Sequence, residues 1–148
     1  MRLALDTNVL AYAEGVNGAA MQGPALDIIS RLPASESFLP VQVLGELFNL
    51  LIRKGGRSGR KAQSALLIWQ DAFLLIETSR KVMTAALNLA SEHRLQIWDA
   101  VILSAASSAG CRLLLSADLQ DGFTWNGLTV VNPFSKTPHH LLADALEL

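Results

Sequence analysis

Short apolar runs alternate with longer amphipathic segments along the chain. Runs rich in Leu, Ile and Val that span a few residues and end at polar or turn residues predict buried β-strands. These runs lie at residues 2–6, 37–40, 72–77, 111–116 and 128–132. The segments between them predict helices. The predicted helices cover residues 7–14, about 24–32, 41–53, about 60–70, about 79–93 and about 98–109.

Strands that alternate with helices predict an α/β fold, with a five-stranded parallel sheet and helices on both faces. The 148 residues are the usual size of one domain, and 51% of them are hydrophobic against 17% that are charged. This composition supplies a core and excludes a disordered chain. The chain contains no internal repeat and no low-complexity segment.

Charge and cysteine content limit the cellular compartment and the kinds of binding partner that the protein can have. The formal net charge is −1, so any attraction to nucleic acid has to come from a local basic patch. The single cysteine, Cys111, cannot form an internal disulfide, which favours a reducing, cytoplasmic setting. The N-terminus lacks a basic segment followed by an apolar signal core, so we expect no secretion. Residues 100–111 are too short and too rich in serine to span a bilayer, so we expect no membrane partner.

Acidic residues map to one edge of the predicted sheet. In open parallel sheets, ligands bind outside the carboxyl ends of the strands, near the point where the strand order reverses. Asp6 ends the first strand in the stretch "LALDTNVL", and Asp118 follows the fourth strand. Glu46 lies in the helix that starts after the second strand, and Asp99 opens the helix that leads to the fourth. The topology therefore permits four distant carboxylates to meet.

Two of these acids also have structural explanations. Asp6 can cap the helix that follows it, a role that does not exclude binding a metal, and Asp99 can be a first-turn acid that the helix dipole favours. However, Asp99 shares a helix face with apolar residues, and a buried charge is costly unless it is paired or bound to a metal. Those apolar neighbours are Ile102, Leu103 and Ala106. We therefore favour a functional role for Asp99.

The remaining acids are less distinctive by themselves. Glu46 belongs to a polar stripe on one helix face, which is either a solvated surface or the wall of a polar groove. The stripe comprises Gln42, Glu46, Asn49 and Arg53. Asp118 and Asp121 lie in "SADLQDG", where Asp and Gly are ordinary turn residues. Their significance depends on the other acids at the same edge.

A cluster of four carboxylates needs a compensating cation. Two like charges about 4 Å apart repel by about 4 kcal/mol at an effective dielectric of about 20. Hard oxygen ligands select Mg²⁺ or Mn²⁺ over softer metals. Such an ion activates water and stabilises the attacking and leaving oxygens of a phosphodiester, without a Ser or Cys nucleophile. The acids therefore favour metal-dependent hydrolysis of a phosphodiester.

A basic segment follows the helix that carries Glu46. Five of the twelve Lys and Arg residues fall within nine positions, and three glycines make the segment flexible. Basic loops contact phosphates with salt-dependent affinity that is largely independent of sequence. A solvated surface loop is the alternative, but the neighbouring acidic edge makes nucleic acid the favoured partner. The candidate nucleic-acid-binding residues are Arg53, Lys54, Arg57, Arg60 and Lys61.

Four motifs in this order resemble the PIN-domain ribonucleases, and they are most similar to VapC-type toxins of toxin–antitoxin pairs. The motifs are "LALDTNVLAY", "VLGELFNLL", "WDAVILSAA" and "LLLSADLQDGF" followed by "LTVVNPF". The similarity covers about residues 1–134, which form a PIN-like nuclease domain, and leaves residues 135–148 as a C-terminal tail of unassigned role. It implies a three-layer fold and an endonuclease that cuts RNA with Mg²⁺ or Mn²⁺.

The resemblance also implies roles for individual residues. The expected metal ligands are Asp6, Asp99 and Asp118. Glu46 is expected to complete the catalytic cluster, as a ligand or by positioning water. The expected supporting residues are Thr7, Asn8, Ser116 and Asp121, and Asp121 ranks below Asp118 as the fourth acid. Expected partners are an RNA substrate, a second copy in a homodimer, and a cognate antitoxin that covers the acidic edge with a basic side chain.

Two other functions stay open at this point. One is a phosphatase that works through an aspartyl phosphate, although that chemistry usually needs a second Asp where this chain has Asn8. The other is a catalytically inactive PIN-fold binding module, against which the intact set of acids argues. His139 and His140, in the tail, are expected at the surface and not as metal ligands.

Overall fold

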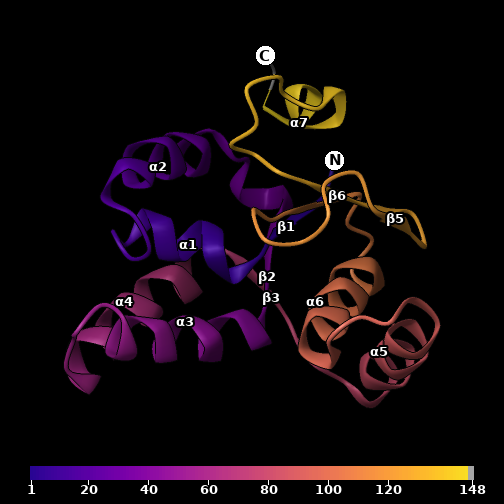
Figure 1. Ribbon diagram of the computed structural model, residues 1–148, viewed down its shortest axis with the longest axis horizontal. Coiled ribbons are helices and arrows are strands. Elements are labelled where there is room, and N and C mark those ends of the chain that lie inside the picture. Colours follow the sequence, from indigo (N-terminus) through magenta and orange to yellow (C-terminus); the bar gives the residue numbers. More distant parts are fainter. Residues whose placement is uncertain (147–148) are drawn as a thin grey trace.

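The computed structural model describes residues 1–146 and contains one sheet flanked by helices (Figure 1). Five strands run parallel in the order β3-β2-β1-β4-β6, and a two-residue strand, β5, pairs antiparallel with β6 at one edge. The strands are β1 (Leu3–Leu5), β2 (Ser37–Pro40), β3 (Leu74–Ile76), β4 (Leu113–Leu115), β5 (Thr124–Trp125) and β6 (Leu128–Val131). The strand order reverses between β1 and β4, so their carboxyl ends mark the switch point.

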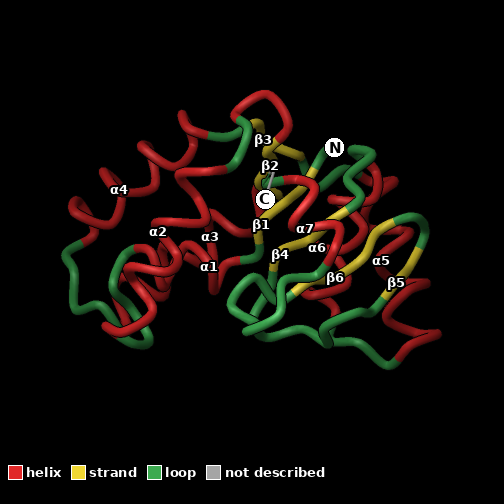
Figure 2. The backbone as a smooth tube through the Cα atoms, turned by 90° about the horizontal axis from the view of Figure 1, so that it is seen from above, coloured by secondary structure: helices red, strands yellow, loops and turns green. Residues whose placement is uncertain are grey.

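Helices form the two outer layers. They are α1 (Thr7–Ala13), α2 (Gln22–Arg31), α3 (Val41–Arg53), α4 (Gly59–Ala72), α5 (Arg80–His93), α6 (Ile97–Ser108) and α7 (His140–Ala145), with 3₁₀ turns η1 (Ala19–Met21) and η2 (Ala34–Glu36). Figure 2 shows α1–α4 to one side of the sheet and α5 and α6 to the other. The predicted three-layer α/β fold, its five parallel strands and its first six helices are confirmed. No helix within residues 1–146 is both long and apolar enough to cross a membrane.

The centre of the molecule is apolar on both faces of the sheet. β1 and β4 are buried along their whole length, as expected for central parallel strands that helices cover on both sides. Helix α6 is buried continuously over Ala100–Ala106 and contacts β2, β4 and β6. A helix that is apolar all round belongs in a core, and α6 fills one side of it.

The short strand β5 was absent from the sequence prediction. Asn126 and Gly127 join it to β6 and have φ angles of 49° and 82°. An Asn-Gly pair with two positive φ angles is the preferred two-residue turn of a β-hairpin. The signal was therefore present in "TWNGLTV", but the strand before the turn is too short to show an apolar pattern.

The tail after residue 134 packs onto the same core. It forms α7, and the His139 side chain caps this helix by accepting the Leu141 N–H through Nδ1 at 3.1 Å. Leu142 is buried among the core residues. The His139 ring stacks on His140 at 4.4 Å between centroids, so these histidines contribute to local structure.

Candidate functional site

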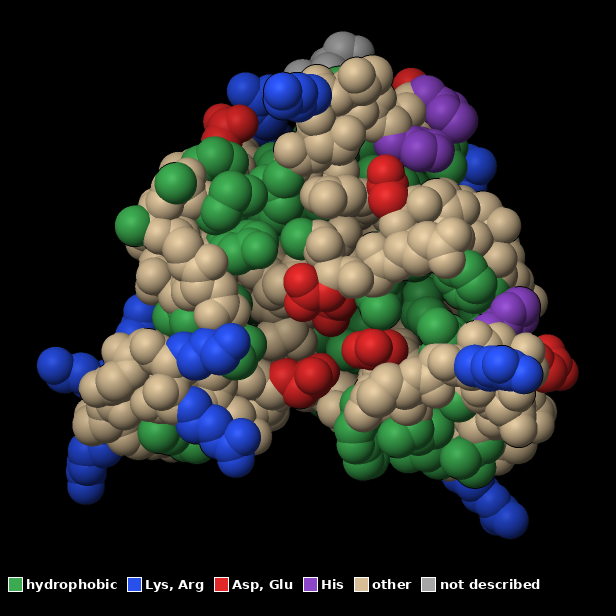
Figure 3. Space-filling model, in the orientation of Figure 1, with side chains coloured by type: hydrophobic (Ala, Val, Ile, Leu, Met, Phe, Trp, Pro, Cys, Tyr) green, Lys and Arg blue, Asp and Glu red, His purple; other side chains and the backbone are tan. Residues whose placement is uncertain are grey.

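A cavity of about 420 Å³ opens at the carboxyl ends of the strands. Figure 3 shows acidic side chains gathered around a hollow between the α1–α4 side and the α5–α6 side. The residues that line it are Asp6, Thr7, Asn8, Asn17, Glu46, Asn49, Leu50, Arg53, Lys54, Asp99 and Asp118. The four acids expected to form the catalytic cluster therefore share one cavity, although they come from four separate segments.

Asp6 is both a helix cap and part of the cavity wall. Its Oδ1 accepts the Thr7 N–H at 2.8 Å, and its Oδ2 accepts the Ser116 hydroxyl at 2.8 Å and the Asn8 amide at 3.2 Å. Asp6 is 5% exposed, and this burial is the main cause that raises its pKa to about 6. The charges of Asp99 and Asp118 raise it further, against the lowering effect of the hydrogen bonds.

Ser116 and Asn8 hold the ends of β1 and β4 together. The buried Ser116 hydroxyl, besides donating to Asp6, accepts the Asp118 N–H at 3.2 Å. The Asn8 Oδ1 accepts the Ala117 N–H at 2.9 Å, and its amide group also donates to Ser116 at 3.4 Å. Both side chains thus form hydrogen bonds within the protein. These bonds hold the Asp6 carboxylate and the turn that carries Asp118 in place.

Glu46 and Asp99 are half-buried and lie near like charges. The Thr7 hydroxyl donates to Glu46 Oε1 at 3.3 Å. The pKa of Glu46 is raised, first by burial and then by the charge of Asp6. The pKa of Asp99 is also raised, first by burial and then by the charge of Asp118. Three acids of one cavity therefore resist ionisation because their negative charges are close and partly removed from water.

Asp118 and Asp121 separate clearly in the structure. Asp118 lines the cavity, whereas Asp121 does not. Instead, Asp121 Oδ1 accepts the Asn132 N–H at 2.8 Å and so ties the loop after β4 to the segment after β6. The geometry therefore favours Asp118 as the fourth acid of the cavity, and Asp121 stabilises the loop after β4.

The donor set suits a hard divalent cation. Within residues 1–146, no Lys or Arg forms an ion pair with any of the four acids, so their charge is unbalanced. In the same part of the chain, no group of three His, Cys, Asp or Glu side chains is arranged to hold an ion by itself. Mg²⁺ commonly binds one or two carboxylates and keeps several waters. The four oxygen-donor side chains around one cavity therefore fit such an ion in chemistry and charge.

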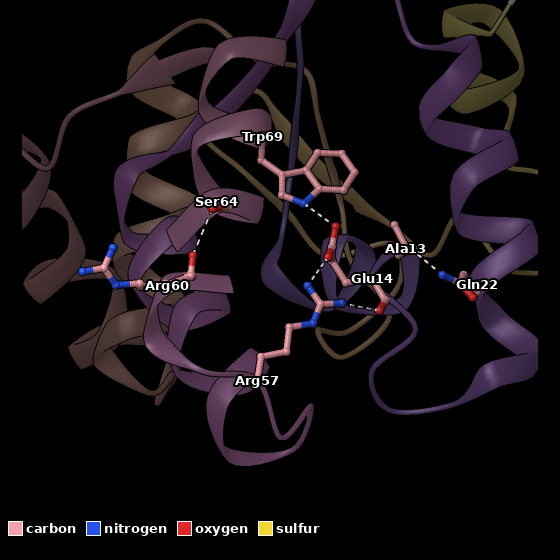
Figure 4. A network of polar contacts seen from close by, with 7 residues as sticks. All are labelled: Ala13, Glu14, Gln22, Arg57, Arg60, Ser64 and Trp69. Atoms are coloured by element: carbon pink, nitrogen blue, oxygen red, sulfur yellow. Dashed lines mark hydrogen bonds and ion pairs between the residues drawn. The ribbon is translucent and has the colours of Figure 1, made fainter. Parts of the chain in front are cut away.

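The five basic residues differ in their surroundings. Arg53 and Lys54 line the cavity, and Arg60 and Lys61 lie exposed at the start of α4. Arg57 instead forms an ion pair with Glu14 and donates to the Glu14 carbonyl at 2.9 Å (Figure 4). Its guanidinium is therefore occupied within the chain.

Three cavity residues were missing from the predicted site, the apolar Leu50 and the polar Asn17 and Asn49. Asn49 was recognised in the polar stripe of its helix but not assigned a role, and its place one turn after Glu46 is the signal that could have identified it. Asn17 comes from the loop after α1 and has a φ of 67°. Nothing in the sequence around Asn17 indicates that this loop reaches the cavity.

The fold is that of a known family. Residues 3–121 match the PIN domain, and the chain belongs to this family. A comparison with curated protein sequences gives no match.

Solved structures with the same fold include toxins and toxin–antitoxin complexes. VapC20 of Mycobacterium tuberculosis, described as a toxin that cleaves the sarcin–ricin loop, is 22% identical with a TM-score of 0.66, over 78% of this chain and 91% of that one. A toxin–antitoxin complex from Klebsiella pneumoniae gives 20% identity and a TM-score of 0.68, over 90% and 98%. VapBC2 of Rickettsia felis, bound to promoter DNA, is 20% identical with a TM-score of 0.63, over 88% of this chain and 97% of that one. At these identities, the likeness establishes the fold.

Proposed function

We propose that this protein is a metal-dependent endoribonuclease that acts as the toxin of a toxin–antitoxin pair. The observation that carries the proposal is the cavity in which four acids and two basic residues meet, none of which forms an ion pair within the described residues 1–146. Carboxylates bind a divalent ion, and Arg or Lys binds phosphate, so a cavity with both suits a phosphodiester. Membership of the PIN family and the solved neighbours support RNA as the substrate.

The acids divide the chemical tasks. Asp6, Asp99 and Asp118 would hold Mg²⁺ or Mn²⁺, and Glu46 would serve as a further ligand or orient water. The chemistry that such an ion supplies is activation of water and neutralisation of charge on the cleaved phosphate. Thr7 keeps Glu46 turned into the cavity, and Ser116 fixes Asp6. Because burial and the charge of Asp6 raise the pKa of Glu46, its carboxylate is a stronger base than that of an exposed glutamate, which suits it to accept a proton from water.

The basic residues would bind the RNA backbone. Arg53 and Lys54 lie at the cavity and suit the phosphates beside the cleaved bond, while Arg60 and Lys61 extend this surface onto α4. Arg57 is better explained as a structural residue, because Glu14 occupies it. This division predicts that the salt dependence of RNA binding comes from the four free cations and not from Arg57.

The partners follow from the neighbours and from the charge of the cavity. Toxin–antitoxin complexes share the fold, so we infer a cognate antitoxin that inserts a basic side chain among the acids. Homodimer formation and a cytoplasmic setting belong to the same proposal. Against the phosphatase alternative, Asn8 donates to Asp6 and Ser116, so position 8 is structural here.

The direct test is RNA cleavage by Asp6→Asn and Asp99→Asn in the presence of Mg²⁺ or Mn²⁺. Both variants should lose activity, while circular dichroism and thermal melting show an intact fold. Calorimetric titration with Mn²⁺ should detect binding to the wild type and weaker binding to each variant. Full cleavage by both variants would exclude the mechanism, and absence of metal binding by the wild type would favour the inactive binding module.

A further inference from the structure

Trp98 is a large apolar side chain that remains open to solvent. It is 45% exposed, whereas Trp69 is 9% exposed and donates its indole N–H to Glu14 at 3.0 Å. Within residues 1–146, no hydrogen bond and no aromatic contact involves the Trp98 ring. Burial of an aromatic side chain stabilises a protein, so a tryptophan that stays exposed on an ordered helix needs an explanation.

The exposed part of Trp98 lies at the cavity end of α6. Residues Ala100–Ala106 are buried, so solvent reaches this half of the helix mainly at its first turn. The next residue in that turn is Asp99, which lines the cavity, and consecutive Cα atoms lie about 3.8 Å apart. Trp98 itself does not line the cavity, so its exposed side chain lies on the surface outside the cavity, next to the turn that carries Asp99.

The first turn of α6 is held firmly. Gln96 Oε1 accepts the Trp98 N–H at 2.8 Å and the Asp99 N–H at 3.0 Å, so one side chain caps both residues. The helix behind this turn is anchored in the core. The backbone of Trp98 and Asp99 is thus fixed by one cap, so a ligand that contacts the indole binds at a defined place along the chain from the acid.

We propose that Trp98 stacks on a base that flanks the cleaved phosphodiester and so positions the substrate strand. This inference rests on the proposed function. A base offers its face to an aromatic ring only when it is unstacked from its neighbours, as in single strands and loops. Stacking of this kind tolerates different bases, whereas Arg53 and Lys54, which line the neighbouring cavity, suit the flanking phosphates.

The test measures RNA binding apart from cleavage. The probes are a short single-stranded RNA of mixed sequence and the same strand annealed to its complement. Binding is measured with Mg²⁺ in the Asp6→Asn protein, which should leave the RNA intact, and in wild-type protein with a chelator as a second background. We expect Trp98→Ala to weaken single-strand binding about tenfold or more and Trp98→Phe to stay within about threefold. Leu87→Ala, at an exposed apolar residue on α5, is the matched control and should bind normally.

Fluorescence and kinetics provide independent readouts. Single-stranded RNA should quench the emission of the protein with Trp98, and Trp98→Phe should abolish most of this change. In cleavage assays, Trp98→Ala should raise KM and leave kcat nearly unchanged. The inference is overturned if Trp98→Ala and Trp98→Phe weaken binding equally, if duplex RNA binding falls as much, or if sedimentation shows that Trp98→Ala dissociates a dimer. Failure of the wild type to cleave RNA would instead count against the proposed function, because binding is measured separately.

Discussion

The two ends of helix α1 carry carboxylates in opposite electrostatic situations. Asp6 caps the N-terminal end and accepts hydrogen bonds only from neutral groups, those of Thr7, Asn8 and Ser116. Glu14, just past the C-terminal end, pairs with Arg57 and accepts the indole N–H of Trp69. Each carboxylate joins segments that are remote in the chain, but in the part of the chain that the structure describes Glu14 forms an ion pair and Asp6 does not.

This difference separates an acid that holds structure from one that is available for chemistry. The Glu14 network connects the end of α1 to two other segments (Figure 4). Arg57 belongs to the loop between α3 and α4, and Trp69 belongs to the C-terminal part of α4. Its charge is balanced within the chain. At Asp6, neutral donors orient the carboxylate but leave its charge uncompensated among other acids, and burial raises its pKa to about 6. A divalent ion would supply the missing charge.

The largest expected effect is on catalysis by Asp6→Asn. The amide keeps the size of the side chain and an acceptor for the Thr7 N–H, but it loses the charge that binds the ion. Metal-ion stabilisation supplies several kcal/mol to such reactions, so we expect RNA cleavage to fall about 100-fold or more. The melting temperature without metal should change little, because removal of a buried negative charge offsets the loss of the two hydrogen bonds that Oδ2 accepts from Ser116 and Asn8. Cleavage above a tenth of the wild-type rate would contradict the claim that Asp6, unlike Glu14, is a catalytic carboxylate.

The second effect is a pH dependence of stability in the metal-free protein. The pKa of Asp6 is near 3.8 in the unfolded chain and about 6 in the fold, so the folded state binds more protons between these values. The free energy of unfolding should therefore fall as pH rises from about 4 to about 6, by up to about 3 kcal/mol, and then level off. Glu46 and Asp99, which face Asp6 together with Asp118, are shifted in the same direction.

Urea denaturation at several pH values tests this dependence against Asp6→Asn. The difference in unfolding free energy between the two proteins should change between pH 4 and pH 6, because the titration of other groups cancels. Mg²⁺ or Mn²⁺ at pH 7.5 should stabilise the wild type more than the variant. A difference that stays constant over this pH range would show that Asp6 is not the group responsible.

The third effect is structural and concerns the other end of the helix. Glu14→Ala removes the carboxylate that pairs with the half-buried Arg57 and accepts the indole N–H of Trp69, and it leaves Arg57 only the backbone carbonyl of residue 14. Loss of such bonds should destabilise the fold by about 1–3 kcal/mol, measured by urea denaturation. The activity per folded molecule should stay within about threefold of the wild type. Asp27→Ala, which breaks the exposed pair with Arg31, is the matched control and should cost less than about 1 kcal/mol.

Sequence reasoning could place the acids because chain order alone determines their edge of the sheet. The residues after β1 and β4, the start of α3 and the start of α6 all meet at the carboxyl ends of parallel strands. The rule needs only the correct sequence of strands and helices, and boundaries wrong by two residues do not disturb it. Asp6, Glu46, Asp99 and Asp118 were therefore predicted to share a site, and they line one cavity.

The same reasoning could not distinguish among neighbouring residues of one type. Arg57 and Arg53 look alike in a basic loop, but a contact with Glu14, 43 positions away, occupies Arg57. No periodicity along the chain encodes such a pairing, since it depends on how the α3–α4 loop folds back over α1. Asn17 was missed for a similar reason, because the path of its loop follows from backbone turns and not from an apolar pattern.

The smallest expected effect distinguishes the two acids of the loop after β4. Asp118 lines the cavity, so Asp118→Asn should lower cleavage clearly, while Asp121→Asn should stay within about threefold of the wild type because the amide oxygen can still accept the Asn132 N–H. Asp121→Ala removes that acceptor and should reduce the unfolding free energy by about 1 kcal/mol. Parallel measurement of cleavage and urea denaturation separates the two residues. Equal loss of activity in Asp118→Asn and Asp121→Asn would mean that both carboxylates act on the substrate or the ion, and the loop would then have to move for Asp121 to reach the cavity.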